Sequence, residues 1–465
     1  MSDKITASEL EARLSYKKTN FYEKADENTI DAAYKYAEAY KLFLDNAKTE
    51  RESVSFSIEM AEEKGYIPYR FGMKLEAGGK YYYNNRGRSL YLFRVGSEDI
   101  NNGIRIAASH VDNPRLDVKQ SPLYEDGGMA FFKTRYYGGI RKYQWVTIPL
   151  ALHGVVVKQD GTVVNVRIGE DAGDPVLYIN DLLPHLAQEQ SKAPLGSAIP
   201  AENLNLLLGS RPYPGCEKDA IRLNILNILN EKYGITEEDF LSADLSAVPA
   251  AKACDIGLDR SLIGAYGHDD RVCAFPTMSA LFSTDESVHT VMVILADKEE
   301  IGSDGNTGMQ CELMIDLIHE IAHALGGNPA TVKANSKCLS ADVTACFDPN
   351  FPEVYERRNV TMLNCGVAMS KYTGHGGKVG TNDAPAEYVA WIRKIMAEAG
   401  VIWQAGDMGK TDVGGGGTVA KYIAKHNIET VDLGVPVISM HAPMEVISKA
   451  DLYTAHQAFK AFYKA

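Results

Sequence analysis

Residues 291–303 read VMVILADKEEIGS, an apolar run followed by two adjacent glutamates and a Gly-Ser turn. The apolar residues Val291 to Ala296 favour a buried β-strand, because aliphatic and β-branched side chains suit a sheet that is covered on both faces. Glu299 and Glu300 then follow the carboxyl end of that strand, where open α/β sheets bind their ligands. A lone acidic pair is most often a solvated turn, but paired carboxylates at this place can also hold a divalent metal and transfer a proton.

The segments around this strand alternate between helix-like and strand-like patterns. Residues 91–95 and 104–108 favour strands that come before it. Further segments favour helices at 30–47, 49–65, 278–283, 311–325, 384–399, 418–426 and from 448 onward, and strands at 359–369 and 435–440. Strands that alternate with helices indicate an α/β fold with a mostly parallel sheet covered by helices.

Residues 120–243 differ in texture from the rest of the chain. Val146 to Val157 is strongly apolar, residues 163–168 alternate with a period of two, and Gly and Pro turns are frequent. This pattern indicates a β-rich domain. We therefore expect an α/β domain made of residues 1–119 and 244–465, with a β-rich domain at 120–243 inserted into it.

The composition disfavours several classes of protein. A chain of 465 residues, 45% of them hydrophobic, can bury a large core, and its net charge of −13 argues against nucleic acid as a partner. No apolar stretch approaches the roughly 20 residues that span a bilayer, and the start, MSDK, lacks a signal-peptide pattern. These features predict a cytoplasmic protein with no membrane partner. The seven cysteines include no Cys-x-x-Cys pair, which argues against a disulfide framework or a zinc ribbon.

Histidines and carboxylates lie at or just after the ends of several apolar segments. Besides the two glutamates, they are His110, Asp269, Asp342 and His441. Taken singly, such a residue is more often a surface residue or a helix N-cap. Together they form a mixed imidazole and carboxylate set that zinc, cobalt or manganese accepts. Two metals that share one carboxylate need a further His and carboxylate each, and the set supplies these with one glutamate left as a base.

Five segments that carry these residues resemble the M18 metallo-aminopeptidases, the family of aspartyl aminopeptidase and vacuolar aminopeptidase I. The segments are ASHVDNPRLDVK at 108–119, GHDDR at 267–271, DKEEIGS at 297–303, SAD at 340–342 and SMH at 439–441. The resemblance implies an enzyme that removes N-terminal residues from peptides with free amino termini. It implies two divalent ions per subunit, zinc first, with cobalt or manganese as alternatives. It also implies that the inserted domain mediates dimer contacts within a homo-oligomer, a tetrahedral dodecamer.

The same resemblance implies a role for individual residues. The implied metal ligands are His110 with Asp342, Glu300 with His441, and Asp269 as the bridge. Glu299 would be the general base that takes a proton from the metal-bridging water. Asp112, two residues after His110, would fix the geometry of the imidazole. Lys371 would help to bind the substrate, and His185 would reach the active site of a neighbouring subunit.

A rival metal-binding pattern lies at residues 319–323, HEIAH. On a helix, His319 and His323 would face the same side and Glu320 would be the base, as in single-zinc metalloproteases. Against this, Pro329 stands where the longer form of the motif needs a third His, and the flanks fit an ordinary amphipathic helix. A non-catalytic metal-binding protein is a third hypothesis, which Glu299 disfavours because a metal store does not need it.

Overall fold

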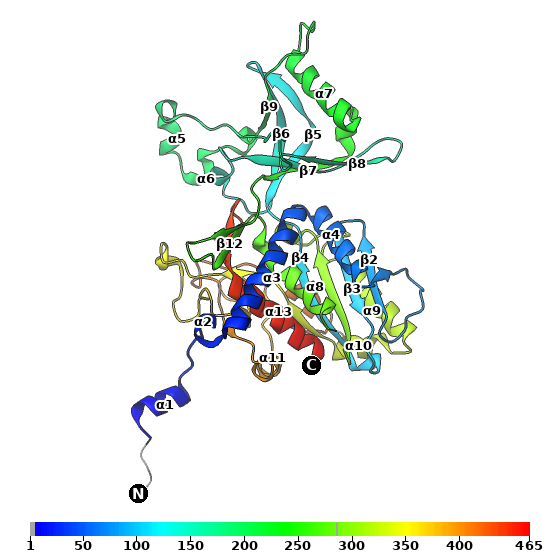
Figure 1. The fold of residues 1–465 in the computed structure, drawn as a ribbon, viewed down its shortest axis with the longest axis vertical. Helices are drawn as coiled ribbons and strands as arrows, with labels where there is room; N and C mark the ends of the chain where they lie inside the picture. Colours follow the sequence, from blue (N-terminus) through cyan, green and yellow to red (C-terminus); the bar gives the residue numbers. More distant parts are fainter. Residues whose placement is uncertain (1–4, 285–286) are drawn as a thin grey trace.

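The computed structural model describes residues 5–284 and 287–465, which form a large body and a smaller one (Figure 1). The large body contains a nine-stranded sheet and a five-stranded sheet, and the smaller body is built on a six-stranded sheet. Chain segments from before and after the six-stranded sheet come together in the large body. Among the described residues, we find no helix of the length and apolar character that crossing a membrane requires.

The interior of the nine-stranded sheet contains β13 (Thr290–Ala296), the strand predicted before the two glutamates. Four neighbouring strands are parallel, in the order β13, β4 (Ile104–His110), β14 (Lys337–Ser340) and β18 (Glu429–Gly434). The edges are completed by β1 (Ile67–Pro68), β2 (Lys80–Asn85), β3 (Ser89–Arg94), β16 (Val367–Ser370) and β17 (Trp403–Ala405). The predicted α/β fold with a mostly parallel sheet is confirmed.

Helices pack against both faces of this sheet. One face is covered by α3 (Glu27–Asn46), α4 (Glu50–Glu63), α8 (His268–Phe282), α11 (Ala386–Glu398) and α13 (Lys449–Lys464). The other face is covered by α9 (Leu313–Ala324), α10 (Pro329–Asn335) and α12 (Ala420–Ala424). Within β13, Val291 and Val293 enter the first core, whereas Met292 and Ile294 enter the second. This burial on both sides explains why the strand is a continuous apolar run.

Some predicted boundaries were wrong. The strand predicted at 435–440 is shorter in the structure, and the strand that ends just before it, β18, was not predicted. The two strands are separate because Pro436 has no N–H to continue the ladder of the large sheet. β18 ends at Gly434, and β19 (Pro436–Ile438) belongs instead to the five-stranded sheet, with β11 (Cys254–Ile256), β12 (Leu262–Ala265), β15 (Thr344–Ala345) and β20 (Glu445–Ser448). Of the strand predicted at 359–369, β16 contains only the last residues, and the helix predicted at 418–426 is shorter at both ends.

The six-stranded sheet is antiparallel and lies at the top of Figure 1. Its strands, in spatial order, are β8 (Val163–Ile168), β7 (Leu150–Val157), β10 (Ala243–Pro249), β5 (Arg115–Asp126), β6 (Met129–Tyr137) and β9 (Leu206–Gly209). Helix α7 (Ala220–Tyr233) packs on it through Ile221 and Leu229, in a core that also contains Trp145. The sheet therefore has a hydrophobic core of its own.

A buried charge cluster joins this sheet to the large body. Lys48, between α3 and α4, places its Nζ 2.6 Å from Glu170, and His153 Nε2 of β7 lies 3.2 Å from the same carboxylate. The other ring nitrogen of His153 lies 2.7 Å from Glu52 of α4. Burial alone would lower the pKa of His153, but its bonds to Glu170 and Glu52 raise it above the usual value. Burial would raise the pKa of Glu170, but His153 and Lys48 lower it to about 2.

Replacing His153 with glutamine is expected to destabilise the protein more at pH 6 than at pH 9. Because the folded-state pKa of His153 is raised, its proton contributes stability that is fully present below about pH 6.5 and is lost as pH rises through the folded pKa. Thermal unfolding of both proteins at the two pH values measures the difference in Tm. A difference that does not change with pH would show that the ring acts only through packing.

Candidate metal centre

The predicted ligands meet at one edge of the large sheet. His110 is the last residue of β4, and Glu299 and Glu300 form the turn η6 (Glu299–Ile301) directly after β13. Asp342 follows β14, Asp269 lies in the first turn of α8, and His441 follows β19. Since β4, β13 and β14 are parallel, their carboxyl ends lie together, and the residues that follow them share one site.

Asp269 stands between the two histidines. Its Oδ1 lies 3.1 Å from His110 Nε2, and its Oδ2 lies 3.0 Å from His441 Nε2. Asp342 Oδ1 is 3.9 Å from His110 Nε2 on one side, and Glu300 Oε1 is 3.5 Å from His441 Nε2 on the other. Within the described chain, these residues form two groups whose ligand atoms all lie within 4.8 Å of one another, and Asp269 belongs to both.

The chemistry of this set fits divalent cations. Burial and the neighbouring carboxylates raise the pKa of Asp342 and Glu300 well above the usual value, so their charges lack compensation from the protein alone. Glu300 Oε1 is buried and accepts no hydrogen bond within the described chain. Imidazole nitrogens and carboxylate oxygens at these spacings suit zinc, cobalt or manganese, and bound cations would compensate the buried charge.

Asp112 holds the turn that carries the two glutamates. Its Oδ1 accepts a hydrogen bond from Glu299 N at 3.1 Å, and its Oδ2 accepts one from Glu300 N at 3.2 Å and one from Tyr137 Oη at 2.8 Å. His110 Nδ1 lies 3.0 Å from the Asp112 backbone oxygen, which leaves Nε2 facing Asp269. Asp112 therefore fixes two backbone amides and one imidazole at the same time.

Two supports of the site were missed in the sequence. Glu445 of β20 accepts hydrogen bonds from His441 N at 2.6 Å and from Asp269 N at 3.1 Å. Burial, together with the charge of Asp269, raises the pKa of Glu445 to about 8. Gly139, from the chain after β6, accepts a hydrogen bond from His441 Nδ1 at 2.9 Å. A glutamate four residues after His441, inside an apolar strand, was the available signal for Glu445.

The Glu299 carboxylate faces the same pocket as the ligands. It forms no ion pair with any Lys, Arg or His of the described residues, so its oxygens are open to a ligand. Burial raises the pKa of Glu299 to about 7, with Asp112 and Asp269 adding to the rise and His110 and His441 opposing it. A carboxylate with a pKa in this range can both accept and donate a proton near neutral pH.

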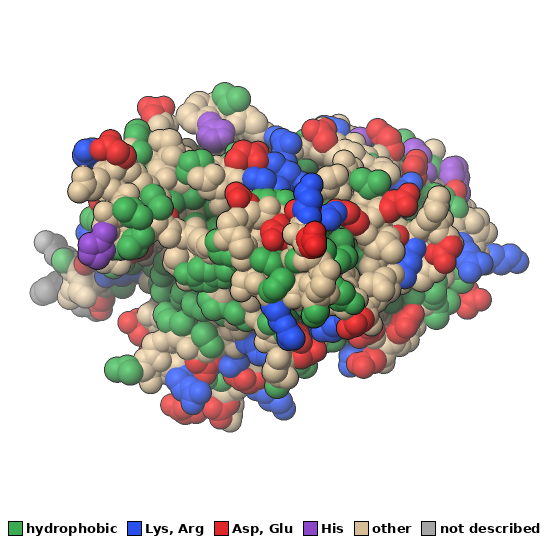
Figure 2. Space-filling view, turned by 90° about the horizontal axis from the view of Figure 1, so that it is seen from above, with side chains coloured by type: hydrophobic (Ala, Val, Ile, Leu, Met, Phe, Trp, Pro, Cys, Tyr) green, Lys and Arg blue, Asp and Glu red, His purple; other side chains and the backbone are tan. Residues whose placement is uncertain are grey.

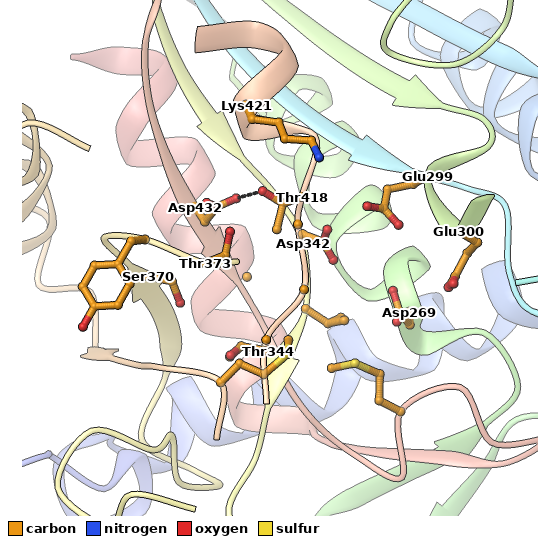
Figure 3. A pocket seen from close by; sticks show the side chains of 18 of the residues that line it. Asp269, Glu299, Glu300, Asp342, Thr344, Ser370, Thr373, Thr418, Lys421 and Asp432 are labelled. Carbon is orange, nitrogen blue, oxygen red and sulfur yellow. Dashed lines mark hydrogen bonds between the residues drawn. The ribbon is translucent and has the colours of Figure 1, made fainter. Parts of the chain in front are cut away.

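The pocket beside the ligands has a volume of about 370 Å³. Asp269, Glu299, Glu300 and Asp342 form one wall. Facing them, as Figure 3 shows, are residues of β16, of the loop that follows it, of the glycine-rich loop at 414–417 and its end, of α12 and of β18: Ser370, Thr373, Thr418, Lys421 and Asp432. The cavity is large enough for a few amino-acid residues, so the site can hold part of a peptide.

Two residues expected to bind substrate lie outside this pocket. Lys371 Nζ lies 2.9 Å from Asp383 Oδ1, and about 40% of the Lys371 side chain is exposed. The residues on either side of it, Ser370 and Tyr372, line the pocket, but Lys371 itself does not. His185 lies in the turn η3 (Pro184–Leu186), is exposed, and does not line the pocket of its own chain.

The rival HEIAH segment lies on α9, which covers the sheet. Glu320 accepts a hydrogen bond from Gly72 N at 2.9 Å, and His323 is exposed. Among the residues that the structure describes, neither His319 nor His323 belongs to a group with metal-ligand spacing. The helix has the apolar face of an ordinary sheet-covering helix, since Leu317 and Ile321 are fully buried.

Comparisons with known proteins agree with this geometry. The family profile described as aminopeptidase I zinc metalloprotease (M18) matches residues 43–463. A probable M18 family aminopeptidase 1 from Clostridium acetobutylicum is 46% identical over 453 residues, which cover 95% of this chain and 97% of that protein. The crystal structure of an M18 aminopeptidase from Thermotoga maritima matches 97% of this chain and 100% of its own, with a TM-score of 0.93 and 41% identity. The crystal structure of aminopeptidase I from Clostridium acetobutylicum covers the same shares, with a TM-score of 0.91 and 42% identity. The chain belongs to the M18 family of zinc metallo-aminopeptidases.

Proposed function

We propose that this M18 aminopeptidase works with two divalent ions per subunit and with Glu299 as its general base. The observation that carries the proposal is the position of Asp269. Its two oxygens lie 3.1 and 3.0 Å from the Nε2 atoms of two different histidines, so each oxygen could share an ion with one of them. His110 and Asp342 would hold one ion, Glu300 and His441 would hold the other, and Asp269 would bridge them. A single-metal site would have no use for the second group.

The residues of the chain have separate tasks in this reaction. When bound, the two ions would polarise the peptide carbonyl and make a neighbouring water more acidic. Glu299 accepts a proton from the attacking water and then donates it to the leaving amine. Asp112 keeps Glu299 in place through the backbone, because it accepts the hydrogen bond of the Glu299 amide. The pocket opposite Glu299 receives the N-terminal part of the peptide.

A panel of aminoacyl-arylamides tests this function and the choice of metal. The metal-free protein is loaded with zinc, cobalt or manganese in turn, and release of the arylamine is measured for acidic, basic and apolar N-terminal residues. We expect turnover with at least one metal and loss of turnover after chelation. Blocking the amino group by acetylation should abolish cleavage, and cleavage of the acetylated substrate would exclude an aminopeptidase.

We also propose that the chain forms a homo-oligomer, a tetrahedral dodecamer, through its inserted β-rich domain at 120–243. Figure 2 looks down on this end of the molecule, where hydrophobic side chains reach the surface. The segment before β9 contains four exposed leucines, Leu182, Leu183, Leu186 and Leu195. A structure with 22% identity and a TM-score of 0.75, that of a yeast aminopeptidase 1, is described as a dodecamer. The likeness to that structure supports the fold of this chain, whereas the dodecameric assembly of this chain is our proposal.

Sedimentation is expected to give a mass of about twelve times 51.0 kDa. Leu186→Asp should reduce that mass, because a carboxylate replaces an exposed apolar contact.

His185→Ala should keep the mass but lower turnover, since we propose that His185 completes the active site of a neighbouring subunit. Full activity of protein that sediments with the mass of a monomer would rule out this role of His185. The expected cytoplasmic location is tested separately by fractionation of cells.

A further inference from the structure

The pocket contains a lysine that the proposed mechanism does not use. Lys421 extends from α12 into the space that Glu299 and Asp342 also face (Figure 3). Its Nζ lies 4.8 Å from the centre of the Tyr422 ring, and no carboxylate of the described residues lies within ion-pairing distance of it. The two lysines of the neighbouring loop differ, because Lys371 and Lys378 both pair with Asp383 at 2.9 Å. Five acidic residues line the same pocket, yet Lys421 forms no ion pair with any of them.

The glycine-rich loop leaves room for this side chain. A Cβ on Gly417 would stand 3.3 Å from both Lys421 Nζ and the Gly380 backbone oxygen, and 3.8 Å from Lys421 Cε, so a larger residue would press on the lysine and on the neighbouring loop. Gly417 does not have a positive φ, and its backbone therefore does not require glycine. A Cβ on Gly416 would meet nothing within 4 Å, which leaves this part of the loop open. The loop glycines 415–417 and Lys421 line the same pocket.

The other charged residue on this side of the pocket is shielded. Asp432 is 4% exposed, and its Oδ1 accepts a hydrogen bond from Thr418 Oγ1 at 2.8 Å. Burial raises the pKa of Asp432 to about 6, so this carboxylate is still ionised at neutral pH, but its Oδ1 already has Thr418 as a partner. The remaining groups there, such as Ser370 and Thr373, are neutral. Away from the metal ligands, Lys421 therefore supplies the positive charge among the described residues that line this pocket.

We propose that Lys421 binds a carboxylate of the peptide substrate and so determines which peptides are cleaved. The proposal rests on the aminopeptidase function above, in which the free amino group and the scissile bond lie beside the metal ligands. An ammonium without a partner favours an anionic group by a charge-assisted hydrogen bond. The carboxylate has two sources: the side chain of an acidic N-terminal residue, or the C-terminus of a dipeptide or tripeptide.

Two matched substrate pairs separate these sources. Glutamyl and glutaminyl p-nitroanilides differ only in the charge of the N-terminal side chain, and Leu-Gly differs from Leu-Gly-amide only in the charge of the C-terminus. For the zinc-, cobalt- or manganese-loaded protein, we expect kcat/KM to favour the anionic member of one pair by about 10- to 100-fold. Lys421→Met should bring that ratio to near one, mainly through KM, because a ground-state contact is lost.

Control variants keep this result specific. Lys421→Arg should retain the preference, and Lys378→Met, which removes an exposed lysine outside the pocket, should leave the ratio unchanged. Lys371→Met is measured beside them as the competing specificity residue. Gly417→Ala should lower the same ratio with the lysine still present, because the added methyl group crowds Nζ. If circular dichroism shows that Lys421→Met does not fold, Gly417→Ala tests the proposal in its place.

The possible outcomes either support or overturn the proposal. A ratio that stays the same in Lys421→Met and Gly417→Ala, or a wild type without preference in either pair, overturns it while leaving the aminopeptidase intact. A ratio that falls in Lys371→Met instead assigns specificity to Lys371. No cleavage of any of the four substrates with any metal rejects the proposed function, and the role of Lys421 with it.

Discussion

Glu299→Gln is expected to lower kcat by about two to four orders of magnitude, which is the usual contribution of a general base. Glutamine keeps the size of the side chain but cannot accept the proton of the attacking water. The backbone hydrogen bond from residue 299 to Asp112 is independent of the side chain, so the turn should persist. Metal content should stay at the wild-type level, because Glu299 belongs to neither ligand group among the described residues.

Steady-state kinetics and elemental analysis of the same preparation test this prediction. The matched control is the double variant His319→Ala/His323→Ala on α9, which should retain turnover, since these histidines lie outside the pocket. The reverse pattern, an active Glu299→Gln and an inactive double variant, would move the chemistry to the HEIAH segment. Loss of metal in Glu299→Gln would make Glu299 a ligand rather than a base.

The meeting of these histidines and carboxylates at one place could be predicted because most of them follow a recognisable strand. β4, β13 and β14 are apolar runs, and parallel strands bring their carboxyl ends to one edge of a sheet. The order of polar residues along the chain therefore translates directly into a shared site. His110 and Glu300 needed only this rule. Asp342 follows the same logic, although its strand is a short one of four residues.

Other parts of the site depend on contacts that no local sequence pattern predicts. Lys371 and Lys421 are both lysines near glycine-rich segments, and which one enters the pocket depends on the path of two loops. Gly415 has a φ of 133° and lies against Gly374, where a Cβ would stand 2.1 Å from the carbonyl oxygen. This close approach fixes the loops relative to each other. It joins residues 41 positions apart, so spacing along the chain could not reveal it.

The supports of the site are also distant in sequence. Tyr137 and Gly139 come from the chain around β6, yet they bond to Asp112 and His441. Glu445 reaches the site because β20 pairs with β12 in the five-stranded sheet. The sequence predicted no third sheet, because the strand expected at 435–440 was assigned to the large sheet and β18, just before it, was not predicted. The break at Pro436 therefore decides both the topology and the position of His441.

Asp269→Asn is expected to remove both ions, because Asp269 is the one residue common to the two ligand groups of the described chain. Asparagine keeps the shape but loses the charge and one of the two oxygens that face His110 and His441. Metal affinity should fall by more than about 100-fold, the upper loss for groups that only orient ligands. Elemental analysis after dialysis should give two ions per subunit for the wild type and fewer than one for the variant.

Two further variants make the stoichiometry decisive. Glu300→Gln removes a ligand from one group only, so one ion should remain with His110 and Asp342. Asp270→Asn is the matched control: this neighbouring carboxyl is fully buried, burial raises its pKa well above the usual value, and it belongs to neither ligand group. It should therefore keep both ions, since its neutral form resembles asparagine. Two ions bound to Asp269→Asn would exclude the bridge, and one remaining ion would assign Asp269 to a single site, with the other metal held by His and carboxylate alone.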